Sequence, residues 1–316
     1  MFKNRFLTNR FLTVVTLLIL VAFVAAGCGG QQAKAPEKPA SAPAAFDAVQ
    51  VTKDATWDAY KKVVTDVQGK TFPLDAAKAK ELLTGNESKY LVIDMRSAED
   101  YAKGHVKGAV NLSIVQLAEN LDKLPTDKTL LLYCYTGQNS GLAMVPLKAY
   151  GYKALSISKG FPMVQQAGFV MDTAVTAFAP AAAKKAADPK EAAAQAGIKD
   201  NFTAVAKQMA AKTLVLSGAD VKKLVDSAAD KYVYVDLRSA ADFDKAHVKG
   251  AVSAPLAALQ DKAKTFPKDK TIVLYCYSGQ TAAMATAPLK AEGFKFISIS
   301  TGYPQAEAGG LAIEKK

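Results

Sequence analysis

Two cysteines stand in nearly identical sequences, each placed where a thiol can become a nucleophile. Cys134 lies in YCYTGQ, and Cys276 lies in YCYSGQ 142 residues further along the chain. Each follows an apolar run typical of a buried strand and precedes a run typical of a helix. The helix N-terminus favours the thiolate, and Gly137 and Gly279 allow the loop backbone to turn close to the sulfur. The pattern predicts two reactive thiols rather than two inert ones.

The elements that must position the first cysteine alternate between strands and helices. Apolar runs cover 90–94, 129–133 and 154–158, and helical patterns cover 75–83 and 137–151. Continuous apolar runs suit strands that are buried on both faces of a parallel sheet. The order predicts an α/β fold with an open parallel sheet and helices on both faces, where ligands bind at the carboxyl ends of the strands.

The chain is a duplication, because the same offset relates many other positions besides the cysteines. Asp94 matches Asp236, and further identical pairs follow in the same register without insertion or deletion. Matching helices at 57–68 and 202–210 are expected to open the two copies. Composition shifts then divide the chain into a signal peptide at 1–27, a flexible tether at 28–49, a first domain at 50–173, a linker at 174–199 that could be partly helical, and a second domain at 200–316.

The N-terminus has the pattern of an export signal. Lys3, Arg5 and Arg10 precede an apolar run at 11–26, which is shorter than the roughly 20 residues of a spanning helix and ends in small residues. An uncleaved anchor helix is the alternative. Cys28 follows Ala-Ala-Gly, which resembles the lipobox of bacterial lipoproteins and implies lipidation there. We therefore expect an exported protein, anchored by lipid to a membrane on the periplasmic or cell-surface side.

Charge and residue counts exclude several other classes. The formal net charge is +11, but the lysines are dispersed, so a solvated basic surface is favoured over nucleic-acid binding. Of the three cysteines, one is assigned to lipid and two to separate domains, so no structural disulfide is expected. The only histidines, His105 and His247, have no cysteines near them, which predicts hydrogen-bonding roles in the fold and no metal site.

The motifs around both cysteines resemble those of rhodanese-homology sulfurtransferase domains. The segments DMRSAEDYAKGHVKGAVNLS and DLRSAADFDKAHVKGAVSAP, each followed by a strand and then CYTGQN or CYSGQT, carry the family pattern over about 70–168 and 212–310. The resemblance implies a tandem sulfurtransferase of the bacterial lipoprotein type. Cys134 and Cys276 would carry sulfane sulfur as a persulfide, from thiosulfate, polysulfide or a persulfide to a thiol or other nucleophilic acceptor. No metal or organic cofactor is implied.

The resemblance also assigns roles to the surrounding residues. The two loops that would bind substrate comprise Tyr135, Thr136, Gly137, Gln138 and Asn139 in the first copy and Tyr277, Ser278, Gly279, Gln280 and Thr281 in the second. Structural support is expected from Asp94, Arg96, His105, Asp236, Arg238 and His247, while Phe161 and Tyr303 are expected to cap the sites by packing.

Two departures from related patterns narrow the chemistry. Neither loop carries the cation that binds a sulfonate in many thiosulfate-using members, which makes a polysulfide or thiol persulfide at least as suitable as thiosulfate. Position 140 is Ser and position 282 is Ala, where related phosphatases need Arg, so phosphoryl transfer is not expected. Both copies keep the cysteine, which predicts two working sites. The alternative function is a non-catalytic sulfur or chalcogen carrier, or a docking module, for a membrane respiratory complex or another partner in sulfur metabolism.

Overall fold

The computed structural model describes residues 48–66 and 73–316. All of them fall within one compact unit, Phe46–Lys316. The predicted signal peptide, Cys28 and nearly all of the predicted tether lie outside the described residues. Within the described ranges, no helix combines the length and the apolar character that crossing a membrane requires.

The first domain is built on a parallel sheet of four strands in the order β3-β1-β4-β5. Its central pair runs in register from Tyr90 opposite Thr129 to Asp94 opposite Tyr133. An isolated parallel bridge between Leu74 and Ile157 extends the edge beyond β5. The strands are β1 (Tyr90–Asp94), β3 (Val110–Asn111), β4 (Thr129–Tyr133) and β5 (Ala154–Ser156).

The second domain repeats this sheet with one more strand, in the order β10-β8-β11-β12-β7. Every pairing in it is parallel. The strands are β7 (Val215–Leu216), β8 (Tyr232–Asp236), β10 (Val252–Ser253), β11 (Thr271–Tyr275) and β12 (Lys295–Ile299). A short antiparallel pair flanks each sheet: β2 (His105–Val106) with β6 (Met171–Asp172), and β9 (Ala246–Val248) with β13 (Ile313–Lys315).

Helices cover both faces of each sheet, because successive strand residues point to opposite sides. Ile93 and Leu132 enter one hydrophobic cluster, whereas Val92 and Leu131 enter another. The helices of the first domain are α1 (Ala48–Asp66), α2 (Ala76–Leu83), α3 (Ala98–Lys103), α4 (Ile114–Glu119), α5 (Gln138–Ala149) and α6 (Phe161–Gln166), with 3₁₀ turns η1 (Glu87–Lys89) and η2 (Leu121–Lys123). Those of the second are α7 (Pro189–Ala210), α8 (Gly218–Ser227), α9 (Ala240–Lys245), α10 (Leu259–Ala263), α11 (Gln280–Ala291) and α12 (Tyr303–Ala308), with η3 (Ala229–Lys231) and η4 (Leu256–Ala258).

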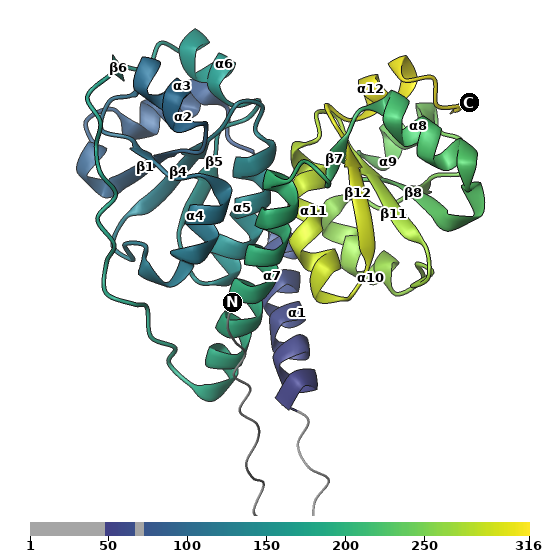
Figure 1. Ribbon diagram of the computed structural model, residues 1–316, viewed down its shortest axis with the longest axis horizontal. Helices are drawn as coiled ribbons and strands as arrows, with labels where there is room; N and C mark the ends of the chain where they lie inside the picture. Colours follow the sequence, from purple (N-terminus) through teal and green to yellow (C-terminus); the bar gives the residue numbers. More distant parts are fainter. Residues whose placement is uncertain (1–47, 67–72) are drawn as a thin grey trace, which may run out of the picture. The chain divides into compact units, whose positions relative to one another are not determined.

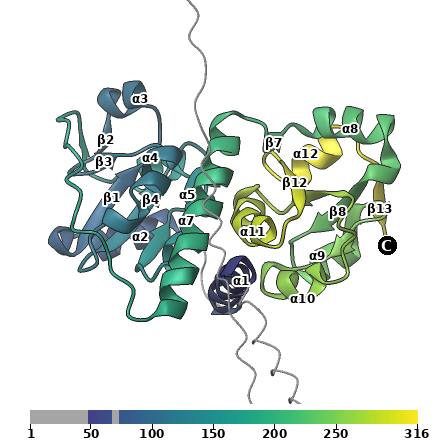
Figure 2. The same ribbon diagram turned by 60° about the horizontal axis from the view of Figure 1, so that its bottom comes forward.

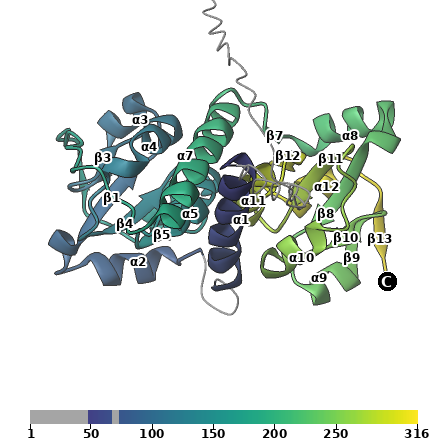
Figure 3. The same cartoon turned by 90° about the horizontal axis from the view of Figure 1, so that it is seen from below.

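The two sheets share one helical layer. Helices α5 and α11, which follow the two cysteines, pack on each other, and α1 and α7 pack beside them. Figures 1, 2 and 3 show these four helices between the teal and yellow sheets from three directions. Most of α5 and α11 is buried, in one cluster that draws side chains from both domains, including Phe202, Leu142 and Leu289. Burying the apolar central residues of these helices against each other removes their surfaces from water and joins the two copies.

The sequence expectations can be compared with these elements. The α/β architecture with two parallel sheets flanked by helices is confirmed, and the strands at 90–94 and 129–133 lie where they were expected. The third run, 154–158, forms a shorter strand that ends at Ser156. Helix α7 begins at Pro189, so the last part of the segment predicted as a linker is helical. Helix α7 starts there because Asp188 caps its N-terminus by accepting a hydrogen bond from the Glu191 amide, and Pro189 occupies the first turn.

Candidate active sites at the two cysteine loops

Both cysteines lie directly after a central strand and before a helix. Cys134 follows β4 and is 2% exposed; Cys276 follows β11 and is 1% exposed. Both are free thiols. The Gly137 amide donates to Cys134 Sγ at 3.2 Å, and the Gly279 amide donates to Cys276 Sγ at 3.1 Å. These glycines are the N-caps of α5 and α11, with φ of 90° and 83°, so each sulfur lies at a helix N-terminus that stabilises negative charge.

A glycine lets the loop after the neighbouring strand approach each cysteine carbonyl closely enough for a hydrogen bond. The Phe161 amide donates to Cys134 O at 2.7 Å, and the Tyr303 amide donates to Cys276 O at 2.7 Å. The residues before them, Gly160 and Gly302, have φ of 69° and 70°. A Cβ would lie 2.4 Å from Cys134 O at the first glycine and 2.2 Å from Cys276 O at the second. Only glycine fits, because both the conformation and the space exclude a side chain.

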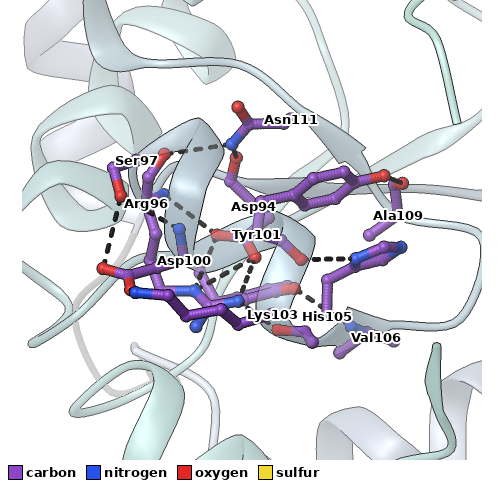
Figure 4. Close-up of polar contacts among 12 residues, drawn as sticks. Asp94, Arg96, Ser97, Asp100, Tyr101, Lys103, His105, Val106, Ala109 and Asn111 are labelled. Carbon is purple, nitrogen blue, oxygen red and sulfur yellow. Dashed lines mark hydrogen bonds and ion pairs between the residues drawn. The ribbon is translucent and has the colours of Figure 1, made fainter. Parts of the chain in front are cut away.

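A buried ion pair joins the strand next to each cysteine strand to the surrounding loops (Figure 4). Arg96 Nη2 donates to Asp94 Oδ2 at 2.6 Å and to Gly104 O at 2.6 Å, and the Arg96 amide donates to Asp94 Oδ1 at 2.9 Å. The Arg96 guanidinium also lies 3.5 Å from the centre of the Phe161 ring. Phe161 therefore packs on the ion pair while its amide holds the cysteine carbonyl.

The second domain repeats this arrangement. Arg238 donates to Asp236 Oδ2 at 2.6 Å and to Ala246 O at 2.6 Å, and lies 3.9 Å from the centre of the Tyr303 ring. The Arg side chains are 4% and 6% exposed and both Asp side chains are fully buried, so these charges compensate each other.

A tyrosine stands exposed at the rim of each loop, and its hydroxyl is tied to the start of a neighbouring helix. Tyr135 is 46% exposed, and its hydroxyl donates to Asp100 and accepts from the Ser97 amide. Tyr277 is 52% exposed and has the same partners in the second copy, Asp242 and the Ser239 amide. The tyrosine hydroxyl, together with Lys103, lowers the pKa of Asp100 to about 2.

The histidines lie behind the sites and bond to the backbone. His105 Nδ1 lies 2.8 Å from Tyr101 O, and the ring stacks on Tyr101 with centroids 3.7 Å apart (Figure 4). His247 Nδ1 lies 2.8 Å from Phe243 O and stacks on Phe243 at 3.8 Å. The described residues contain no group of three or more His, Cys, Asp or Glu that could hold a metal ion.

The glutamines of the loops are placed differently from the expectation that each serves its own cysteine. Gln280 belongs to the Cys276 loop, but its Nε2 donates to Ser156 Oγ at 3.0 Å in the first domain. Gln138 reaches the other way: a Cβ on Gly279 would lie 2.3 Å from its Nε2. The two cysteine loops therefore lie side by side, each touched by a glutamine from the other domain.

The remaining loop residues lie along the rim. Thr136 is exposed, and Asn139, Ser278 and Thr281 are partly exposed. Sequence reasoning did not assign a role to Ser140, whose Oγ lies 3.8 Å from Cys134 Sγ and is buried. Its position in the loop had served only to exclude the arginine of a phosphatase. A polar residue opening a buried helix was the signal that could have identified it.

The fold and the two thiol loops define a class of duplicated α/β domain, with a cysteine at the carboxyl end of a central strand. The rhodanese-like domain family matches residues 75–167 and 217–307, which together are more than half of the chain. The chain therefore belongs to the rhodanese-like family and contains two such domains.

Relatives share single stretches with this chain. The thiosulfate sulfurtransferase PspE of Escherichia coli is 37% identical over 62 residues, which are 19% of this chain and 60% of that protein. The HTH-type transcriptional regulator Rv0324 of Mycobacterium tuberculosis is 36% identical over 90 residues, 28% of this chain and 39% of that protein. The crystal structure of SseA from Escherichia coli, described as a 3-mercaptopyruvate sulfotransferase, is 18% identical with a TM-score of 0.33, covering 74% of this chain and 99% of that one. The chain thus spans less than two thirds of either curated relative.

Proposed function

We propose that this protein is a sulfurtransferase in which Cys134 and Cys276 each carry sulfane sulfur as a persulfide. The observation that carries the proposal is the duplicated thiol geometry. In both domains a cysteine sulfur at a helix N-terminus accepts a hydrogen bond from a loop amide, at 3.2 Å and 3.1 Å. Such a site favours the thiolate and suits the negative charge that a persulfide also bears. Membership of the rhodanese-like family and the sulfurtransferase relatives support the same chemistry.

The proposed cycle has two displacement steps. The cysteine thiolate attacks the outer sulfur of a donor R–S–S⁻; the new Cys–S–S⁻ bond forms while the donor S–S bond breaks and RS⁻ leaves. An acceptor thiolate then attacks the outer sulfur of the cysteine persulfide, which yields R′–S–S⁻ and restores the cysteine thiolate. Electrons and charge balance in both steps, and no metal or organic cofactor takes part.

The loops favour a donor without a sulfonate group. Between Cys134 and Ser140, and between Cys276 and Ala282, the sequence holds no lysine or arginine. Arg96, which lies just after the neighbouring strand β1, is already paired with Asp94. We therefore propose a thiol persulfide or polysulfide as donor ahead of thiosulfate, because a sulfonate would have no loop cation to bind.

The second candidate function is a sulfur or chalcogen carrier that releases its load only to a partner protein. The buried thiols support it, since Cys134 and Cys276 are 2% and 1% exposed while Tyr135 and Tyr277 stand exposed beside them. Exposed aromatic side chains at a site entrance are suited to contact with a protein partner. In this reading the partner is a membrane respiratory complex or another protein of sulfur metabolism.

Mass spectrometry of the full chain tests both candidates. After incubation with polysulfide, the wild type is expected to gain the mass of one sulfur atom on Cys134 and on Cys276, and Cys134→Ser or Cys276→Ser should lose only its own site. Loaded protein is then offered small thiols: rapid discharge supports the sulfurtransferase, and retention supports the carrier. Absence of sulfur on both cysteines rules out both.

We also propose that the protein is exported and lipid-anchored through Cys28. The support is the sequence pattern alone: cationic residues, a short apolar run, then small residues before the cysteine. The test is the mass of the mature N-terminus purified from a membrane fraction. A mature chain that begins at Cys28 and carries acyl chains agrees with the proposal, and a chain that retains residues 1–27 contradicts it.

A further inference from the structure

One glutamine of the second domain is inserted into the first. Gln280 opens α11 and is 1% exposed. Its Nε2 donates to Ser156 Oγ at 3.0 Å and to Ile157 O at 3.3 Å, and its Oε1 accepts from the Lys159 amide at 3.3 Å. The amide group of this glutamine is thus fixed at both ends by the end of β5 and the residues just after it.

The hydrogen bonds continue from this glutamine to the cysteine of the first domain. Ser156 Oγ donates to Ser140 Oγ at 2.8 Å, and Ser140 Oγ lies 3.8 Å from Cys134 Sγ and 3.2 Å from Gly137 O. Both serines are fully buried. A chain of bonds therefore runs from the second domain to the sulfur of the first.

The direction of these bonds follows from the hydrogens available. A glutamine Nε2 can only donate, and a serine hydroxyl has a single hydrogen. Because Gln280 donates to Ser156, the Ser156 hydrogen goes to Ser140, and the Ser140 hydrogen is left for Gly137 O or Cys134 Sγ. A thiolate or persulfide anion attracts that hydrogen through a charge-assisted bond, and bonds in a chain polarise one another.

The second domain lacks this arrangement because its sequence differs at the matching positions. Ala282 stands at the position that matches Ser140, so the hydroxyl that Ser140 provides has no counterpart there. Gly141, which is Ala in the second copy, makes room for the glutamine, because a Cβ there would lie 2.8 Å from Gln280 Cγ. Gln138 Nε2 and Ser298 Oγ, the counterparts of Gln280 and Ser156, are buried without a hydrogen-bond partner among the described residues.

We propose that Gln280 is a positioning residue for the Cys134 site: through Ser156 and Ser140 it directs a hydroxyl hydrogen toward the Cys134 sulfur. This inference deepens the proposed sulfur chemistry and rests on it. The first domain's site is then completed by the second domain, while Cys276 relies on its own loop. The two sites are consequently unequal, and Cys134 holds a sulfur anion with one more donor than Cys276.

The test measures how fast iodoacetamide alkylates each cysteine in the full chain, resolved by peptide mass spectrometry. The readout is the ratio of the Cys134 rate to the Cys276 rate, which needs no sulfur donor. Gln280→Met and Ser156→Ala are expected to lower this ratio by about 2- to 4-fold, since they remove the polarising donors. The matched control Ser298→Ala should leave it unchanged. A role confined to packing predicts the opposite sign, because a loosened loop exposes Cys134 and raises the ratio.

Ser140→Ala places in the first loop the residue that the second copy carries naturally. It should lower the ratio by about 3- to 10-fold, and adding Gln280→Met should lower it no further, because the chain acts through Ser140. The inference is overturned if the losses of Ser140→Ala and Gln280→Met add in the double variant. It is also overturned if the alkylation-rate ratio is unchanged or raised in Gln280→Met and Ser156→Ala, or if Ser298→Ala lowers the ratio equally. If the wild type takes up no sulfur but the ratios behave as expected, the proposed function fails while the positioning by Gln280 stands.

Discussion

Gly160, whose backbone lies against the Cys134 carbonyl, provides a test of what keeps the Cys134 loop in place. Gly160 and Gly108 have nearly equal φ, at 69° and 75°, but different surroundings. A Cβ at Gly160 would lie 2.4 Å from Cys134 O, whereas a Cβ at Gly108 has no heavy atom within 4 Å. Gly108→Ala therefore measures the cost of a positive φ in open surroundings, and Gly160→Ala adds the contact with the cysteine carbonyl and a ψ of −146° that only glycine adopts readily.

The magnitudes can be worked from these geometries. An alanine at positive φ costs about 1–2 kcal/mol, and the ψ of −146° at Gly160 adds to that cost because only glycine adopts this combination readily. Both variants lose similar entropy in the unfolded chain, so that effect cancels in their comparison. Relieving a contact in which the Cβ would lie 2.4 Å from Cys134 O also requires the 160–161 backbone to move away from Cys134, which breaks the 2.7 Å bond from the Phe161 amide. Losing that bond costs about 0.5–1.5 kcal/mol, and leaving the carbonyl buried and unpaired costs more. We expect Gly160→Ala to lose about 2–4 kcal/mol and Gly108→Ala about 1–2 kcal/mol.

Two measurements check this expectation. Urea unfolding gives the free-energy difference between the variants, and mass spectrometry after polysulfide treatment gives sulfur loading at each cysteine. Gly160→Ala should lower loading at Cys134 and spare Cys276, while Gly108→Ala should spare both. Gly302→Ala repeats the experiment at Cys276, where the added Cβ would lie 2.2 Å from Cys276 O. If Gly160→Ala and Gly108→Ala are equal in stability and in loading, the reasoning from the close contact is refuted.

The ion pair and the rim tyrosine give two further predictions. Arg96→Met leaves the fully buried Asp94 without its guanidinium partner, and urea unfolding should show a loss of about 3–5 kcal/mol in stability. Adding Asp94→Asn should recover part of that loss. A loss below about 1 kcal/mol in Arg96→Met would contradict a compensated buried pair. Tyr135→Phe should raise the pKa of Asp100 from about 2 toward its ordinary 3.8, measured by NMR titration of the carboxyl group. Because the folded-state pKa is lowered, this carboxylate stabilises the fold fully above about pH 4 and loses that contribution as the pH falls toward 2. The variant should therefore be less sensitive to acid, and an unchanged titration would show that the tyrosine bond is not formed.

Much of each domain could be predicted from sequence because its signals are local. The runs at 90–94 and 129–133 are continuous and apolar, and they became the central strands β1 and β4. The loop after each central strand could also be predicted, because a cysteine, a glycine and a largely apolar helix follow one another in the sequence. Helix α7 joins the end of the predicted linker, which could be partly helical, to the helix predicted at 202–210. Its full length could not be predicted, because its alanine- and lysine-rich start lacks an apolar period and the helix is stabilised by packing on α1 and α4.

The roles of individual loop residues were harder to predict. Gln138 and Gln280 were assigned to their own cysteines because they are near them in sequence. Their side chains instead cross to the other domain, as the 3.0 Å bond from Gln280 to Ser156 shows. A sequence pattern reports which residues are neighbours along the chain, whereas a side chain's partner depends on which surfaces are buried together.

The sequence alone determined that the chain holds two copies of one α/β domain with a thiol at each central strand end, since strand periodicity, helix signals and glycine turns act over a few residues. Only the tertiary structure decided that α5 and α11 are buried against each other and that Gln280 bonds to the other copy. The bond between Gln280 and Ser156 joins residues 124 apart, and it exists because Gly141 leaves room where the second copy has Ala283. The two loops already differ in sequence where Ser140 matches Ala282, and packing the copies together adds the Gln280 donor on the side that keeps the hydroxyl.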